Sequence, residues 1–202
     1  MNKIEDFFIK NKPIFLLGAV SSEQFPKKNI PEIAFLGKSN VGKSSLINAV
    51  TKSNIAITSK TPGRTKQLNF FNIANKITFV DMPGYGFAKA NKNDIINWNR
   101  LIINYLSNRC NLRRVFLLID SRRGLKENDF DAIYLLDQCS VPYQIILTKT
   151  DEINKTELEE VYNSVKNESK NHAAMLDDIL KCSSKKSFGL DKVREEIYNF
   201  IL

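Results

Sequence analysis

The chain has 202 residues, which suits a single α/β domain with one core and a short extension. Apolar residues make up 43% and charged residues 26%, which excludes wholesale disorder, and the net charge of +8 exceeds what folding requires. Three cysteines without a CxxC pair argue against disulfides and for a cytoplasmic protein, and a single histidine excludes most histidine-based sites. The apolar run Ile14–Val20 is far shorter than the roughly 20 residues of a membrane span, so no membrane partner is expected.

The positive charge is unevenly distributed. Seven cations and a single acid, Asp120, lie between Arg100 and Lys126, and a second basic cluster lies between Lys181 and Arg194. Such clusters are typical of surfaces that bind a polyanion such as RNA, with an ordinary solvated surface as the alternative.

The first 31 residues read as an extension. They contain a short predicted helix around Ile4–Ile9, a strand-like run at Ile14–Val20 and a loop bounded by prolines. We predict that residues 1–31 pack on a single domain formed by residues 32–202, because no linker or repeat interrupts the rest of the chain.

After residue 31, apolar runs alternate with helical stretches. Buried strands are predicted at Ile33–Leu36, Ile77–Asp81, Val115–Asp120 and Tyr143–Thr148. Helices are predicted at Ser44–Val50, Ile95–Leu106, Asn128–Gln138, Glu157–Lys170 and Leu190–Leu202. This alternation indicates right-handed βαβ units, and therefore an α/β fold of three layers with a doubly wound, mostly parallel sheet. One antiparallel edge strand is expected at Gln67–Ala74, which meets Ile77–Asp81 across a tight turn.

A phosphate-binding pattern follows the strand Ile33–Leu36. Eight residues match G-x-x-x-x-G-K-[ST] between that strand and a helix: Gly37, Lys38, Ser39, Asn40, Val41, Gly42, Lys43 and Ser44. The glycines let successive N–H groups face a phosphate, and the helix adds its positive end. Lys43 is expected to reach the β- and γ-phosphates, and Ser44 to bind Mg²⁺.

A second pattern, Asp81-Met82-Pro83-Gly84, ends the next strand. Downstream of a phosphate loop it indicates a γ-phosphate sensor, in which Asp81 reaches Mg²⁺ through water and Gly84 offers a backbone N–H. Tyr85 follows, where many signalling GTPases carry a Gln that orients the attacking water. A phenol lacks the paired donor and acceptor of a carboxamide, so we expect slow intrinsic hydrolysis, completed by a partner or an ion.

Two further strand ends predict a guanine site. The first carries Thr148, Lys149, Thr150 and Asp151; the carboxylate of Asp151 can accept from N1–H and the 2-amino group of guanine, which adenine cannot supply. The Lys149 stem can lie over the base. The second carries Cys182, Ser183 and Ser184, whose backbone N–H groups can reach the guanine O6.

The polar segment between residues 58 and 65 is expected to act as a switch. A hydroxyl from such a Gly/Pro-broken loop can complete the Mg²⁺ shell only when a γ-phosphate is present. We favour Thr65 over Thr61 for this role, because Thr65 lies closest to the predicted edge strand.

Together these stretches resemble one family, the EngB (also YihA or YsxC) ribosome-biogenesis GTP-binding proteins of bacteria. The matching stretches are GKSNVGKSSLIN, SKTPGRTKQLNFF, DMPGYGFA, TKTD and CSSKK, which with the N-terminal extension cover essentially the whole chain. The resemblance implies a small GTPase (P-loop NTPase) fold, Mg²⁺-dependent binding of GTP and GDP, slow hydrolysis of GTP, and a role in assembling the large ribosomal subunit. It also implies a requirement in normal cell division and septation.

The resemblance also implies a role for each matching residue. Phosphates are held by Gly37–Ser44, and Mg²⁺ by Ser44 and Thr65. Switch I consists of Gly63, Arg64, Thr65, Lys66 and Gln67. The γ-phosphate is sensed by Asp81–Gly84, and guanine is held by Thr148–Asp151 and Cys182–Ser184. The residues expected to act in hydrolysis are Lys43, Thr65 and Gly84.

Three positions depart from the family's usual residues. Lys66 stands where the family usually has Gln, which leaves the contacts at the end of switch I open. Arg123 replaces a frequent His and Cys182 a frequent Phe, and both departures are peripheral to the expected chemistry.

Asn40 suggests a site for a second ion. Related GTPases without the catalytic Gln often use an Asn at this position of the loop to ligate K⁺. The alternative is that Asn40 only bonds the loop backbone or switch I.

Two other functions stay open. One is a GTPase domain that serves RNA modification or ion transport, although such proteins usually carry extra domains. The other is a nucleotide-gated interaction module that acts directly in division without RNA. A monomer is expected, as are His172 at the surface and the pair Arg113–Arg114 ahead of a strand.

Overall fold

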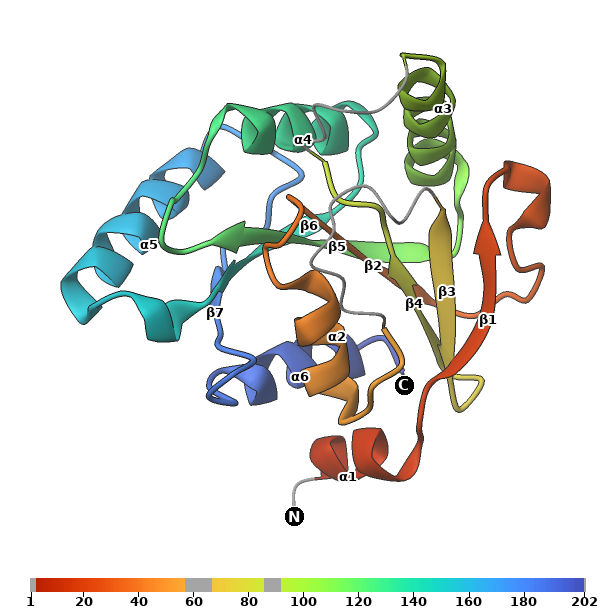
Figure 1. Cartoon of the computed structure of the whole chain (residues 1–202), viewed down its shortest axis with the longest axis horizontal. Helices are drawn as coiled ribbons and strands as arrows, with labels where there is room; N and C mark the ends of the chain where they lie inside the picture. The colour runs from red at the N-terminus through yellow and green to blue at the C-terminus, as the bar shows by residue number, and fades with distance from the viewer. Residues whose placement is uncertain (1–2, 57–66, 86–91, 202) are drawn as a thin grey trace.

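The computed structural model describes residues 3–56, 67–85 and 92–201. A seven-stranded sheet forms its middle layer, with α3, α4 and α5 on one face and α1, α2 and α6 on the other (Figure 1). The strands are β1 Ile14–Ala19, β2 Glu32–Gly37, β3 Leu68–Ile73, β4 Ile77–Asp81, β5 Leu112–Asp120, β6 Tyr143–Thr148 and β7 Leu180–Lys181. The helices are α1 Lys3–Lys10, α2 Lys43–Thr51, α3 Lys92–Asn108, α4 Glu127–Gln138, α5 Lys155–Ser169 and α6 Leu190–Tyr198.

The sheet has the strand order β1-β3-β4-β2-β5-β6-β7. The chain leaves β2 toward β4 on one side and later returns to its other side as β5, so the direction of winding reverses at β2. In such sheets, ligands bind outside the carboxyl ends of the strands at this reversal point. The carboxyl ends of β2, β4, β5 and β6 carry Gly37, Asp81, Asp120 and Thr148.

The predicted fold class is confirmed, with one difference at the edge. Strand β3 pairs antiparallel with β4 as expected, but it is not the outermost strand, because β1 pairs with its free side from Ile14↔Asn72 to Ala19↔Leu68. The backbone N–H and C=O groups of β3 need partners on both sides, and the N-terminal segment supplies them on the outer side.

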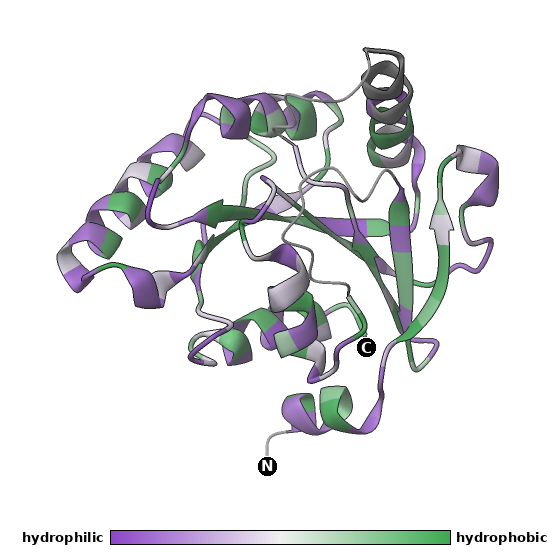
Figure 2. Cartoon of the chain, in the orientation of Figure 1, coloured by the Kyte–Doolittle hydropathy of each residue, from purple (hydrophilic) through white to green (hydrophobic). Residues whose placement is uncertain are grey.

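Each face of the sheet has its own apolar core. On one face, Leu101 of α3, Ile133 of α4 and Val165 of α5 pack on the odd-numbered residues of β5. On the other face, Leu46 of α2, Ile197 of α6 and Phe8 of α1 pack on strand residues such as Phe35 and Phe116. Strands that are buried on both faces appear as continuous hydrophobic stretches in Figure 2, which is the pattern that predicted them.

The N-terminal segment contacts both the sheet and the helix layer formed by α1, α2 and α6. The ring of Phe8 is fully buried near Phe79, and Glu5 forms an ion pair with Lys52 at the end of α2. The division into an extension of residues 1–31 and a domain of residues 32–202 stays a prediction, although β1 is an integral strand of the sheet.

The prediction that His172 is exposed is wrong. Its side chain is buried, with Nδ1 2.6 Å from Asp137 Oδ2 and Nε2 3.2 Å from Glu168 Oε1. The ring also lies against that of Tyr134. The polar residues around His172 suggested that it is exposed to solvent. In the structure, α4 brings Asp137, 35 residues away in the chain, and α5 brings Glu168, four residues away, into contact with its ring.

Candidate functional site

The loop from Gly37 to Ser44 leaves β2 and turns directly into α2. Asn40 has a φ of 64° and Gly42 a φ of 106°, both in the left-handed region, and Gly42 is the N-cap of α2. Because Gly42 has no side chain, no N-cap side chain accepts a hydrogen bond from the N–H groups of the first turn of α2. A helix N-terminus of this kind favours an anion.

Lys43 and Asp81 meet beside this loop. Lys43 Nζ and Asp81 Oδ1 form an ion pair, and both side chains are largely buried. The position of Asp81 at the end of β4 is fixed because Met82 N–H donates to Phe35 O over 3.0 Å. This ion pair shows that Lys43 of the phosphate loop and Asp81, the first residue of the D-x-P-G segment, lie side by side in the site.

The end of the D-x-P-G segment lies directly on the phosphate loop. Tyr85 N–H donates to Gly37 O and Ser39 N–H donates to Tyr85 O, each over 3.3 Å. A Cβ on Gly84 would lie 3.0 Å from both Ser39 N and Ser39 Oγ. A side chain at position 84 would therefore be crowded against the phosphate loop, and glycine avoids this crowding.

The phenol of Tyr85 packs against the core beneath α4 and is bonded to that helix. Its hydroxyl donates to Asp129 Oδ1 over 2.6 Å, and Asp129 also accepts from Lys126 N–H at the start of α4. Burial, followed by the nearby Asp129 charge, raises the pKa of Tyr85 well above its ordinary value. Tyr85 is therefore a neutral structural anchor at this position.

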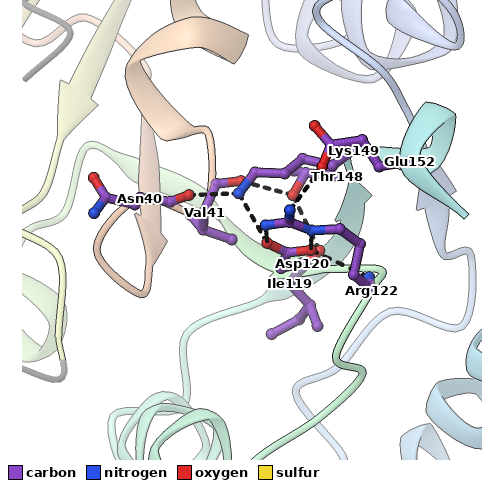
Figure 3. Close-up of polar contacts among 8 residues, drawn as sticks. All are labelled: Asn40, Val41, Ile119, Asp120, Arg122, Thr148, Lys149 and Glu152. Atoms are coloured by element: carbon purple, nitrogen blue, oxygen red, sulfur yellow. Dashed lines mark hydrogen bonds and ion pairs between the residues drawn. The ribbon is translucent and has the colours of Figure 1, made fainter. Parts of the chain in front are cut away.

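Lys149 links the predicted guanine loop to the phosphate loop, as Figure 3 shows. Its Nζ donates to Asn40 O over 2.7 Å and to Asp120 Oδ2 over 2.8 Å. The adjacent Thr148 hydroxyl lies 2.7 Å from Val41 O. Two consecutive residues at the end of β6 thus hold the middle of the phosphate loop.

Asp120 is itself held by a second layer of charge. Arg122 Nε and Nη2 donate to its two carboxylate oxygens over 2.8 and 2.6 Å, and Arg122 Nη1 lies 2.7 Å from Glu152 Oε2 (Figure 3). Burial alone would raise the pKa of Asp120, but hydrogen bonds from Arg122 and Lys149 outweigh it and lower the pKa to about 2. The carboxylate is thus a fixed negative charge.

The two parts of the predicted guanine site adjoin each other. Thr150 N–H donates to Cys182 O over 3.3 Å, and Cys182 N–H donates to Leu147 O over 2.8 Å. A hydrogen bond from Ser183 lowers the pKa of Asp151. Burial raises the pKa of the Cys182 thiol to about 12, so Cys182 acts as an apolar anchor.

Four predicted motifs therefore converge at one edge of the sheet, carried by residues 37–44, 81–84, 148–151 and 182–184. Of predicted switch I, Gly63, Arg64, Thr65 and Lys66 lie outside the described residues. Gln67 is described, and its Nε2 donates to Asn69 Oδ1 over 2.9 Å.

Sequence reasoning missed Asp120 and Arg122 as parts of the site. Asp120 attracted notice only as the single acid in a basic stretch. The available signal was its position at the carboxyl end of a central strand, next to the reversal point of the sheet.

The donors near Lys43 suit a hard cation. Ser44 offers a hydroxyl at the start of α2, and the buried Asp81 offers a carboxylate; oxygen ligands of these kinds are the ones that Mg²⁺ uses beside phosphates. Within the described ranges, no cluster of three or more His, Cys, Asp or Glu side chains could hold a metal ion.

The fold and the four motifs define a P-loop GTPase. In agreement, residues 32–149 match the family described as "50S ribosome-binding GTPase". A relative from Rhodospirillum rubrum, named "Probable GTP-binding protein EngB", is 46% identical over 91% of this chain and 82% of its own length. A relative of the same name from Bartonella tribocorum is 46% identical over 93% and 92%. The chain belongs to the EngB family of GTP-binding proteins, and it is a ribosome-related GTPase that hydrolyses GTP.

Solved structures agree on the fold. A crystal structure described as "a probable GTP-binding protein engB" has a TM-score of 0.65 at 23% identity and covers 84% of this chain and 98% of its own. A structure of Era in complex with MgGDPNP and nucleotides 1506–1542 of 16S ribosomal RNA has a TM-score of 0.68 at 24% identity, covering 86% and 57%. In the part of the chain that is described, no helix has both the length and the apolar character to cross a membrane.

Proposed function

We propose that this protein is a Mg²⁺-dependent GTP switch that assists assembly of the large ribosomal subunit. The phosphates are held by Gly37–Ser44, with Lys43 exchanging its contact with Asp81 for phosphate oxygens. Ser44, with Thr65 from switch I, binds Mg²⁺, which supplies neutralisation of the phosphate charge. Gly84 offers its N–H to the γ-phosphate, and the base is held by Thr148–Asp151 and Cys182–Ser184.

One observation carries this proposal. The base-recognition loop and the phosphate loop are tied directly to each other, through Lys149 Nζ on Asn40 O and the Thr148 hydroxyl beside Val41 O. A nucleotide needs its base site and its phosphate site at a fixed separation, and these bonds set that separation within one rigid unit.

The charge that remains exposed supports a polyanionic partner such as ribosomal RNA. Several cations of the two basic clusters are engaged inside the fold, where Arg109 pairs with Glu32 and Arg194 donates to Val50 O and Ala49 O. Within the two basic clusters, the exposed cations that form no ion pair among the described residues are Arg100, Arg113, Arg123, Lys126, Lys185, Lys186 and Lys192. These side chains can neutralise phosphates without disturbing the core.

The placement of Arg113 and Arg114 ahead of a strand is corrected by the structure, because both lie within β5. Arg114 bonds Gln144 Oε1 over 2.9 Å, pairs with Glu196 and lies over the ring of Phe200. Its charge reversal would damage the fold, so it is unsuitable for testing a surface.

Co-sedimentation with large ribosomal subunits tests the proposal. Wild-type protein with a non-hydrolysable GTP analogue should co-sediment more than with GDP, and less as salt rises. The Arg123→Glu/Lys126→Glu variant should bind nucleotide normally and co-sediment less at a given salt concentration. Equal co-sedimentation in GTP analogue and GDP would overturn the switch, and binding to neither state would favour a division role without RNA.

We also propose that Asn40 ligates K⁺ next to the phosphates. Its side chain is exposed, and among the described residues only its backbone O is bonded, to Lys149. A monovalent cation there would stabilise charge developing in the reaction, as an arginine finger does for about 10³–10⁵ in rate. GTP hydrolysis should be faster in KCl than in NaCl at equal ionic strength and should lose this difference in Asn40→Ala; identical wild-type rates would reject the ion.

We further propose that the protein acts as a monomer and that its requirement in cell division and septation follows from ribosome assembly. Depletion should then lower the amount of mature large subunits before septation fails. Septation defects that precede any change in ribosome profiles would indicate a direct role in division.

A further inference from the structure

The phosphate loop carries a buried hydroxyl, on Ser39, that is unpaired in the described part of the chain. Ser39 Oγ is buried from solvent and has no hydrogen-bond partner among the described residues. A buried hydroxyl without a partner is unfavourable, and native proteins keep such groups mostly where function needs them.

The free hydroxyl lies against the γ-phosphate sensor. A Cβ built on Gly84 would be 3.0 Å from Ser39 Oγ, so the hydroxyl adjoins the Cα of the residue whose N–H is proposed to meet the γ-phosphate. The backbone of Ser39 is fixed there, because its N–H donates to Tyr85 O over 3.3 Å. The Lys43–Asp81 pair belongs to the same two segments.

The usual provider of this polar contact is missing. Tyr85 occupies the position of the water-orienting Gln, and its hydroxyl is already engaged by Asp129 of α4, to which it donates over 2.6 Å. The described part of the D-x-P-G-Y segment therefore offers no side-chain group of the required kind near Gly84.

We propose that Ser39 is a catalytic residue whose hydroxyl holds the attacking water against the γ-phosphate. This inference rests on the proposed phosphate site. The water oxygen forms a bond to the γ-phosphorus while the bond from that phosphorus to the β–γ bridging oxygen breaks, giving GDP and inorganic phosphate; the water proton passes to the phosphate. Ser39 stays neutral throughout and contributes position only, which is how most catalysis of phosphoryl transfer works.

Two other roles for Ser39 make different predictions. If the side chain only needs to be small enough for Gly84 to approach, Ser39→Ala keeps full activity. If the hydroxyl bonds the γ-phosphate in the ground state, Ser39→Ala weakens binding of a GTP analogue relative to GDP. Positioning of water lowers the rate and leaves both affinities unchanged.

The test is single-turnover GTP hydrolysis by Ser39→Ala, with affinities for GDP and a non-hydrolysable GTP analogue measured on the same samples. Ser45→Ala is the matched control, because Ser45 is an exposed serine six residues further along the same loop and helix. We expect a rate loss of about 10- to 100-fold in Ser39→Ala, affinities within about two-fold of wild type, and no change in the control. Thermal unfolding of nucleotide-free Ser39→Ala should be unchanged or higher, since an unpaired hydroxyl has been removed.

Each outcome is decisive. A hydrolysis rate of Ser39→Ala equal to that of wild type overturns the inference, as does a loss that is confined to GTP-analogue affinity. Ser39→Thr, which keeps the hydroxyl, should retain more activity than Ser39→Ala; the reverse order shows that side-chain size alone matters and also overturns it. Failure of the wild type to bind guanine nucleotides would instead remove the proposed site itself.

Discussion

Gly84 is the residue at which the D-x-P-G segment and the phosphate loop come closest. In Gly84→Ala the new Cβ would meet Ser39 N and Oγ at 3.0 Å and Gly37 O at 3.2 Å, and two of these atoms are backbone that cannot rotate away. We expect GTP hydrolysis to fall by about 10- to 100-fold because the segment is displaced, while GDP affinity stays near that of wild type. Rapid hydrolysis by Gly84→Ala would show that the contact is unimportant for the reaction.

For Tyr85 we predict the opposite of Gly84: its substitution should lower the stability of the fold without slowing GTP hydrolysis. Tyr85→Phe removes the bond to Asp129 and leaves that buried carboxylate with one fewer donor. Hydrogen bonds to charged groups are worth about 1.5–3 kcal/mol, so the free energy of unfolding in urea should fall by about that amount. Single-turnover hydrolysis should change by less than about two-fold; a large rate loss in a stable Tyr85→Phe protein would mean that the phenol takes part in catalysis.

Single residues also mark the limits of sequence reasoning. The sequence predicted Lys43, Asp81 and Asp151, because each stands in a motif whose spacing reflects its chemistry. It could not predict where the phenol of Tyr85 points or that His172 is buried, since both depend on carboxylates of α4 that are distant in the chain.

Strand β5 contributes to the site through Asp120 at its carboxyl end, because Asp120 accepts a hydrogen bond from Lys149 Nζ. Asp120→Asn keeps the size of the side chain but removes the charge, so nucleotide affinity should fall by about 10-fold. If Asp120 acts through Lys149, the double variant with Lys149→Met should bind no more weakly than Lys149→Met alone. Losses that simply add would contradict this coupling, and Glu152→Gln, a more exposed member of the same network, serves as the control.

The same carboxylate predicts a pH dependence. The pKa of Asp120 is lowered to about 2 in the folded protein, so its stabilising contribution is complete above its ordinary value of 3.8 and is lost as pH falls toward 2. The difference in the free energy of unfolding between wild type and Asp120→Asn should therefore be constant from neutral pH to about pH 5 and shrink below pH 4. A difference that already disappears between pH 7 and 5 would exclude Asp120 as its source.

The sequence predicted where most helices and strands lie. It predicted less well which strands pair with one another in the sheet. Apolar runs located β2, β4, β5 and β6 to within a few residues because both of their faces are buried, and the turn after β3 predicted its antiparallel pairing. The pairing of β1 outside β3 could not be predicted, because the edge that accepts an apolar N-terminal strand is a matter of tertiary contact.

At the scale of the whole molecule, the site exists because four strand ends meet where the sheet reverses its winding. The two helix layers support it from both faces. Charge counts alone overstated the positive charge that is free at the surface, because Arg109, Arg114 and Arg194 form contacts inside the fold.

The guanine-nucleotide site is tested most directly by the base preference of Asp151→Asn. We propose that the Asp151 carboxylate, next to Ser183 and the loop fixed by Lys149, selects guanine by accepting two hydrogen bonds. Competition binding with GTP, xanthosine triphosphate and ATP should show wild type preferring GTP strongly. The variant should shift its preference toward xanthosine triphosphate, because the new amide can donate to the 2-oxo group of that base. Equal competition by ATP and GTP in the wild type, or an unchanged preference for GTP in Asp151→Asn, would contradict the assignment of the site.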